Sequence, residues 1–129
     1  MPARRLAHVT LVVDDYDRAI AYFTDALGFA LIADTPLGGG KRWVLVGAGA
    51  GSALLLAKAG DDSERAHIGD QTGGRVGFFL ETDDFARDHA AFTAKGVTFM
   101  EPPRHEPYGT VAVFRDLFGN LWDLIEPKR

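Results

Sequence analysis

The sequence predicts an α+β fold built from two similar βαβββ modules, and two repeated patterns support this prediction. HVTLVVDDYDRAIAYFTDALGF (8–29) and RVGFFLETDDFARDHAAFTAKGV (75–97) share one order: an alternating apolar strand, two acidic residues, an amphipathic helix and a glycine before an apolar residue. Further along each copy, GAGAGSALLLAK (47–58) corresponds to RDLFGNLWDLIE (115–126). Two copies are too few for a solenoid, so we expect them to share one core. Paired modules usually leave a cleft between them, where a ligand is expected to bind.

Composition limits the organisation and the partners of the chain. With 129 residues it is long enough for one domain with a real core, so we expect a single domain over 1–129. A net charge of −4 argues against nucleic acid or an anionic membrane as the main partner. The absence of cysteine excludes disulfides and thiolate chemistry and fits a reducing cytoplasm. The first apolar run soon meets Asp14, which indicates a strand and neither a signal peptide nor a membrane span.

The first module is expected over about 5–58. Alternation predicts a strand over about 6–13, and Asp14 or Asp15 is suited to cap the helix that follows. One stripe of that helix is apolar, and Gly28 is expected to end it; the stripe consists of Tyr16, Ile20, Phe23 and Leu27. Further strands are expected over 29–34, 43–46 and 52–57, with Pro36 and the glycines at 38–40 forming a flexible loop.

The second module is expected over about 75–127, after a polar linker at about 59–74. His89 occupies the helix position that Ile20 holds in the first module, which predicts a partly buried packing histidine. Each helix should cover one face of its sheet and leave the other face open. The expected elements are a strand over 75–81, a helix over 83–94, and strands over 97–101, 110–115 and 121–125.

The duplicated order resembles the vicinal oxygen chelate superfamily, which includes glyoxalase I, extradiol dioxygenases, fosfomycin-resistance enzymes and bleomycin-binding proteins. The segments that carry the resemblance are HVTLVV with the two acids that follow, AIAYFTDALGF (19–29) and FRDLFGNLWDLIEP (114–127). The resemblance covers essentially the whole chain. It implies a glyoxalase-like cup of curved mixed sheets and a homodimer, but it does not specify the reaction, because this superfamily hosts several enzyme classes and non-catalytic drug binders.

The resemblance also implies where a divalent ion (Zn, Ni, Mn or Fe) would bind. His8 lies at the start of the first strand, where metal-dependent relatives have a ligand, and Asp123 occupies the position of their glutamate in the last strand. The two remaining positions carry Arg75 and Leu55. Because a guanidinium is never deprotonated in proteins, Arg75 repels a cation. His8 and Asp123 therefore form an incomplete ligand set, for which weak metal binding is expected.

Arg75 has two interpretations. In the first it replaces the metal electrically as a fixed positive charge in the cup, paired with Asp123 and near His8, and binds an anionic or oxygen-rich ligand with bidentate hydrogen bonds. In the second the register differs by a residue or two and Arg75 points to solvent. Alternation places Arg75, Gly77 and Phe79 on one face, with the small Gly77 leaving room in the cup, and this favours the first interpretation.

The other candidate residues also have a functional and a structural interpretation. Asp123 lies among apolar neighbours on its strand face, so it needs a partner or a metal. His8 either faces the cup or belongs to the core. Tyr108, on the proline-rich stretch 101–110, either hydrogen-bonds a ligand at the rim or packs there. Trp43 and Phe79 either form aromatic walls for a ligand or belong to the core.

Two functions follow from these residues. The first is a glyoxalase-like enzyme, such as a lactoylglutathione-lyase-like lyase or isomerase, in which His8 or Asp123 moves a proton on a small oxygen-rich substrate, with a divalent metal as Lewis acid if one binds. The alternative is a metal-free protein that binds a small molecule or an antibiotic, as bleomycin-resistance proteins do, and sequesters an aromatic or cationic compound. Metal content distinguishes the two functions.

Overall fold

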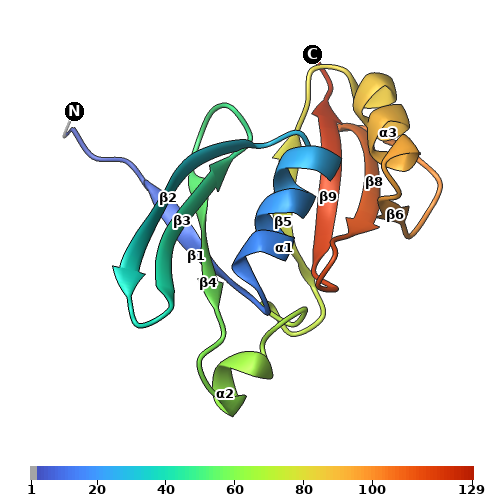
Figure 1. Cartoon of the computed structure of the whole chain (residues 1–129). Coiled ribbons are helices and arrows are strands. Elements are labelled where there is room, and N and C mark those ends of the chain that lie inside the picture. The colour runs from blue at the N-terminus through green and yellow to red at the C-terminus, as the bar shows by residue number, and fades with distance from the viewer. Residues whose placement is uncertain (1–2) are drawn as a thin grey trace. The chain divides into compact units, whose positions relative to one another are not determined.

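The structure of the protein, a computed structural model, describes residues 3–129. The first two residues of the predicted domain lie outside this described part. The chain forms two compact units, of which unit 1 ends at Ala66 and unit 2 spans His67–Arg129. Figure 1 shows the helices and strands of each unit. Within residues 3–129, no helix has both the length and the apolar character that a membrane crossing requires.

Unit 1 has the predicted βαβββ order. Its sheet has the strand order β1-β4-β3-β2, in which β1 and β4 are parallel and the other neighbours are antiparallel. The elements are β1 (His8–Val13), α1 (Tyr16–Ala21), a π-helical turn η1 (Tyr22–Ala26), β2 (Ala30–Gly38), β3 (Lys41–Gly47), β4 (Ala53–Lys58) and a short helix α2 (Asp62–Arg65).

Capping and burial position helix α1 on one face of this sheet. Asp15 is the N-cap, as the sequence indicated, and its carboxylate accepts the backbone N–H of Arg18 at 2.8 Å. After α1 the chain widens into η1, where the N–H of Leu27 donates to the carbonyl of Tyr22. Phe23 is fully buried in this segment. The helix-facing side of the sheet supplies the other large side chains of unit 1 that are fully buried, namely Leu11, Val13, Val44, Val46 and Leu56.

The segment predicted as a flexible loop is the end of a β-hairpin, and the prediction was wrong for Pro36 and Gly38, which belong to β2. β2 extends to Gly38 and includes Pro36, which an edge strand tolerates because its missing N–H is not needed on the open side. The turn is made by Gly39 and Gly40, whose positive φ angles of 63° and 81° favour glycine. The predicted linker also contains helix α2, capped by Asp61.

Unit 2 repeats the order of unit 1 with one addition. Its sheet has the order β5-β9-β8-β6, with β5 and β9 parallel, and a short strand β7 that also pairs with β8. The sequence prediction missed β7. The elements are β5 (Val76–Glu81), α3 (Phe85–Ala94), β6 (Thr98–Phe99), β7 (Arg104–Glu106), β8 (Gly109–Arg115) and β9 (Leu121–Pro127).

Helix α3 packs on one face of the second sheet. Its N-cap is Asp84, which accepts the N–H of Arg87 at 3.0 Å. Glu126 accepts the N–H of Phe85 at 2.7 Å, so this strand residue also satisfies a free donor at the start of the helix. His89 has the predicted packing role, because its ring lies 4.2 Å from that of Phe99.

A buried carboxylate organises the turn between β8 and β9. Asp116 is only 5% exposed. Its side chain accepts the backbone N–H groups of Phe118 and Asn120, both at 2.9 Å, and the amide of Asn120. It also accepts the indole N–H of Trp122 at 3.0 Å. These bonds join the turn to the start of β9, the strand that carries Asp123.

Candidate functional site

Strand pairing gathers Phe79, Val113 and Asp123 on the helix-free face of unit 2. Phe79 of β5 and Val113 of β8 are the direct neighbours of Asp123 on either side of β9. The alternate residues of these strands face α3, as the contact between Phe92 and Phe114 at 5.6 Å shows. The helix-free face of unit 2, with Phe79, Val113, Asp123 and the nearby ion pair of Glu101 and Arg104, is called the Asp123 face below.

The Asp123 carboxylate is half-buried and incompletely bonded. Its Oδ1 atom is buried and has no hydrogen-bond partner among residues 3–129. Burial raises the pKa of the Asp123 carboxyl; the positive charge of Arg104 opposes this effect, and the negative charge of Glu101 adds to it. A buried acceptor without a partner is costly, so Asp123 is suited to receive a donor from a ligand.

Arg104 lies near Asp123 but is held by other residues. Its Nε donates to both carboxylate oxygens of Glu101 at 3.0 Å, and its Nη1 donates to Glu106 at 3.2 Å. Interaction with Glu101 raises the pKa of the Arg104 guanidinium, and interaction with Tyr108 raises it further. Glu101 in turn accepts the N–H of Val113 at 2.9 Å.

Glu101 and Arg104 are residues that the sequence reading missed. Their opposite charges three positions apart were the available signal, but this signal becomes informative only once β7 is known to pair with β8.

The aromatic residues proposed for unit 2 are exposed and do not belong to the core. Phe79 is 68% exposed and is the direct cross-strand neighbour of Asp123. Tyr108 is also exposed, and it interacts with Arg104 as described above. The exposed ring of Phe79 and the half-buried carboxylate of Asp123 thus offer an apolar and a polar contact side by side.

A β-bulge separates Arg75 from this face. β5 carries one extra residue between Val76 and Phe78, opposite the step from Leu121 to Trp122. The bulge interrupts the strict alternation that was expected to align Arg75, Gly77 and Phe79. Arg75 itself is exposed and precedes β5.

The predicted empty space beside Gly77 is also filled. A Cβ atom at Gly77 would lie 2.6 Å from Cγ2 of Thr72, so the absence of a side chain serves close packing against Thr72.

In unit 1 the structure brings His8 and Trp43 together. The two rings meet edge to face with their centroids 5.5 Å apart. His8 is half-buried and Trp43 is 37% exposed, so the pair lies partly at the surface. Leu55, the residue at an expected ligand position, pairs with Thr10 and lies on the helix-free face of its sheet.

A cavity of about 440 Å³ lies at one end of the sheet of unit 1. It combines an exposed tryptophan and apolar side chains with charged groups from the ends of β3 and β4 and from the region of α2. Its lining residues are Tyr16, Leu37, Lys41, Arg42, Trp43, Leu55, Leu56, Ala57, Lys58, Gly60, Asp61 and Glu64.

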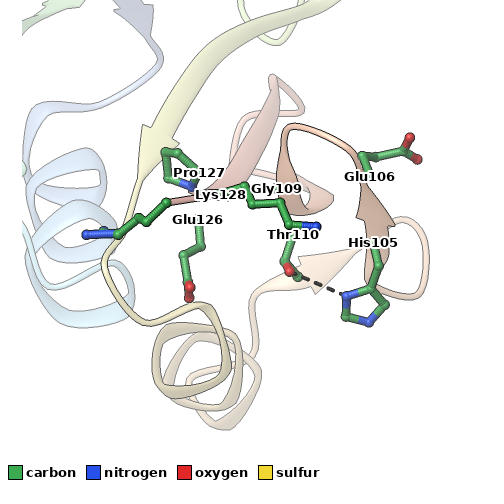
Figure 2. A pocket seen from close by; sticks show the side chains of 8 residues that line it. His105, Glu106, Gly109, Thr110, Glu126, Pro127 and Lys128 are labelled. Atoms are coloured by element: carbon green, nitrogen blue, oxygen red, sulfur yellow. Dashed lines mark hydrogen bonds between the residues drawn. The ribbon is translucent and has the colours of Figure 1, made fainter.

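A smaller cleft of about 270 Å³ lies in unit 2 beside β7, β8 and β9. Figure 2 shows the His105 ring turned toward Thr110, whose Oγ1 lies 3.4 Å from Nδ1 of the ring. Thr110 pairs with Glu126, and both alternate with the residues of the Asp123 face. Asp123 is not among the residues that line this cleft.

The donor groups do not fit a resident divalent metal. Within residues 3–129, no group of three or more histidine, aspartate or glutamate side chains is arranged to hold an ion. Catalytic zinc sites need three protein ligands, whereas the expected set offers only His8 and Asp123. Arg104 places a cation near Asp123, which adds a repulsive charge.

Comparison with known proteins agrees with this architecture. Residues 5–124 match the family model described as Glyoxalase/Bleomycin resistance protein/Dioxygenase superfamily. An uncharacterized protein of Shewanella frigidimarina is 48% identical over 124 residues, covering 94% of this chain and 92% of that protein. The crystal structure of UcmS2 superimposes with a TM-score of 0.80 at 35% identity, covering 97% and 98% of the two chains. That of TnmS3, an antibiotic binding protein from Streptomyces sp. CB03234, gives 0.78 at 29% identity and covers 99% of each. The chain thus belongs to the glyoxalase/bleomycin resistance protein/dioxygenase superfamily, which confirms the resemblance seen in its sequence.

Proposed function

We propose that this protein binds a small aromatic compound without a metal, and that the Asp123 face makes the principal contacts. The observation that carries the proposal is the buried, unpartnered Oδ1 of Asp123 beside the exposed ring of Phe79. The ring offers an apolar surface for stacking, and the carboxylate offers an acceptor. A planar compound with a hydroxyl or amine donor satisfies both groups at once.

The similarity to TnmS3 supports a binding role. That protein is described as an antibiotic binding protein, and its identity of 29% extends over 99% of this chain. Members of this superfamily often use divalent metals, but the donors of this chain do not form a suitable set. We therefore propose sequestration, the metal-free alternative, ahead of catalysis.

Of the remaining predicted site residues, Tyr108 adds a secondary contact to this proposal. Tyr108 is exposed and interacts with Arg104, so its hydroxyl is available to a ligand. In unit 1, His8 and Trp43 form an aromatic pair; a ligand contact there stays a separate prediction for that unit. Arg75 is an exposed cation that the bulge in β5 separates from the Asp123 face, so its role in ligand binding stays a prediction outside this proposal.

A second candidate function is proton transfer, and the raised pKa of Asp123 favours it. A carboxyl group whose pKa is raised by burial is a better general base near neutral pH than an ordinary one. In this glyoxalase-like lyase or isomerase, Asp123 takes a proton from a carbon next to a carbonyl group. Turnover of the hemithioacetal of methylglyoxal and glutathione, measured with and without added Zn, Ni, Mn or Fe, tests this function.

A matched pair of probes tests the binding proposal. We expect 1,5-dihydroxynaphthalene, in buffer with EDTA, to bind about tenfold more tightly than 1,5-dimethoxynaphthalene, because only the first donates a hydrogen bond to a charged acceptor. Asp123→Ala should abolish this preference. Phe79→Ala should weaken both probes about threefold, since ring contact does not depend on the donor. Chemical-shift titration of labelled protein gives the dissociation constants.

Leu31→Ala, which shortens an exposed apolar side chain of unit 1, is the control and should leave both affinities unchanged. Equal affinity for the two probes in the parent protein contradicts the proposal, as does binding that appears only after metal is added. The predicted homodimer and the predicted cytoplasmic location stay predictions; light scattering on the purified protein measures the first.

A further inference from the structure

We propose that the cavity of unit 1 is a second binding site, specific for an aromatic anion. The negative group lies between Lys41 and Lys58, and the ring rests against Trp43. This inference is independent of the Asp123 face, because every residue that lines the cavity belongs to unit 1.

The acidic residues of the cavity are occupied by local capping. Asp61 is the N-cap of α2 and accepts the N–H of Glu64 at 2.8 Å. Glu64 accepts the N–H of Gly60 at 3.2 Å. Each carboxylate thus satisfies a backbone donor at the start of the short helix, and within residues 3–129 neither forms an ion pair with Lys41 or Lys58.

Arg42 is occupied as well. Its Nη2 and Nε donate to the two carboxylate oxygens of Asp34 at 2.7 and 3.1 Å, and its Nη1 donates to Asp17 at 2.9 Å. The guanidinium also lies over the ring of Tyr16, 5.1 Å from its centroid. Two carboxylates and an aromatic face hold Arg42, so it is not the group that recognises a ligand.

Among the described residues that line the cavity, Lys41 and Lys58 are the cations without an ion pair. Within the part of the chain that the structure describes, every ion pair of the cavity region involves other residues. Lys41 begins β3 and Lys58 ends β4, and these antiparallel strands bring both lysines to the same end of the sheet. Both lysines line the cavity together with Arg42, so its wall carries positive charge that suits an anion.

The rest of the cavity is suited to an apolar ring. Trp43, Leu37 and Leu55 line it, and both Trp43 and Leu37 are exposed. An exposed tryptophan beside two unpaired lysines combines stacking with charge recognition. The volume of about 440 Å³ falls within the range of small-molecule sites.

The two tryptophans of the protein provide a direct test. Trp43 lines the cavity, whereas Trp122 is 4% exposed and bonded to Asp116. In nitrogen–proton correlation spectra we expect 2-naphthoate to shift the indole signal of Trp43 and not that of Trp122. Lys41→Met and Lys58→Met should each weaken binding about threefold, and the double variant about tenfold, as for exposed charge pairs. The neutral isostere 2-naphthamide should bind more weakly and be insensitive to both substitutions.

Lys95→Met, at the end of α3 in unit 2, is the matched control for removal of an exposed lysine and should have no effect. Phe79→Ala should also leave 2-naphthoate binding unchanged, which separates this site from the proposed function. Comparison with 2-naphthyl phosphate shows whether a carboxylate or a phosphate is preferred; dependence on the two lysines supports the proposal in either case. Equal binding of 2-naphthamide, shifts centred on unit 2, or no shift of Trp43 at millimolar probe overturns it.

Discussion

Replacing Asp116 with alanine should lower the free energy of unfolding by about 3 kcal/mol, because several buried donors lose their acceptor together. The carboxylate accepts backbone N–H groups of Phe118 and Asn120, the side-chain amide of Asn120 and the indole of Trp122. Water reaches this position poorly, since Asp116 is 5% and Trp122 4% exposed. Chemical denaturation followed by circular dichroism measures the loss.

Asp116→Asn is the informative comparison. Asparagine retains one acceptor oxygen but places an amide donor where the other carboxylate oxygen accepted a bond. The free energy of unfolding should therefore fall by about half as much as in Asp116→Ala. Asp25→Ala, which removes an exposed carboxylate from η1, should change stability by less than about 0.5 kcal/mol. If Asp116→Ala were as stable as the parent protein, the turn would not depend on this network.

Replacing Asp123 with asparagine should stabilise the protein at neutral pH by about 1 kcal/mol, because it removes a charge from a half-buried position with an unpartnered acceptor. The folded protein holds the pKa of this carboxyl above its ordinary value of 3.8, mainly through burial. Ionisation of Asp123 is thus harder in the folded than in the unfolded state. This effect lowers the stability of the parent protein only at pH values at which Asp123 is ionised.

The pH dependence has a defined sign. Below pH 3.8 the carboxyl is protonated in both states, and the two proteins should be equally stable apart from the amide substitution itself. As pH rises from 3.8 through the raised pKa, the unfolded state releases its proton first, so the parent protein loses stability relative to Asp123→Asn. Melting temperatures between pH 3.5 and 7.5 measure the difference.

The difference in melting temperature between Asp123→Asn and the parent protein should grow with pH and then level off. Asp25→Asn, at an exposed position, should show no such trend. An advantage of the asparagine variant that shrinks as pH rises would mean that a cation stabilises the ionised Asp123 more than burial penalises it.

Local sequence was sufficient for most of the secondary structure. The alternation around His8 and the aspartate at position 15 predicted β1 and the start of α1, because side-chain periodicity and capping act over a few residues. The prediction failed at Pro36, which lies within β2, because an edge strand tolerates proline and edge position is a property of the sheet. It missed β7 because three residues are too few to give a periodic signal.

The candidate site was predicted only in part. The position of Asp123 among apolar neighbours indicated a carboxylate in need of a partner, and the structure shows its Oδ1 buried without one within residues 3–129. The alignment of Arg75 with Phe79 was not predictable, because the bulge in β5 changes the alternation between them. Glu101 and Arg104 were missed because their pairing depends on strand β7.

The amino-acid sequence by itself determined the duplicated module, the order of its elements and the family, since these follow from periodicity and from motifs that are read within one segment. Tertiary structure alone decided which charges are free. Arg42 pairs with carboxylates from other segments, and Arg104 pairs with Glu101 and Glu106 close by in the chain. Asp116 accepts its hydrogen bonds within a turn, and Asp123, Lys41 and Lys58 are left available. Charges are neutralised by whatever lies within a few ångströms, and folding sets those distances between residues far apart in the chain.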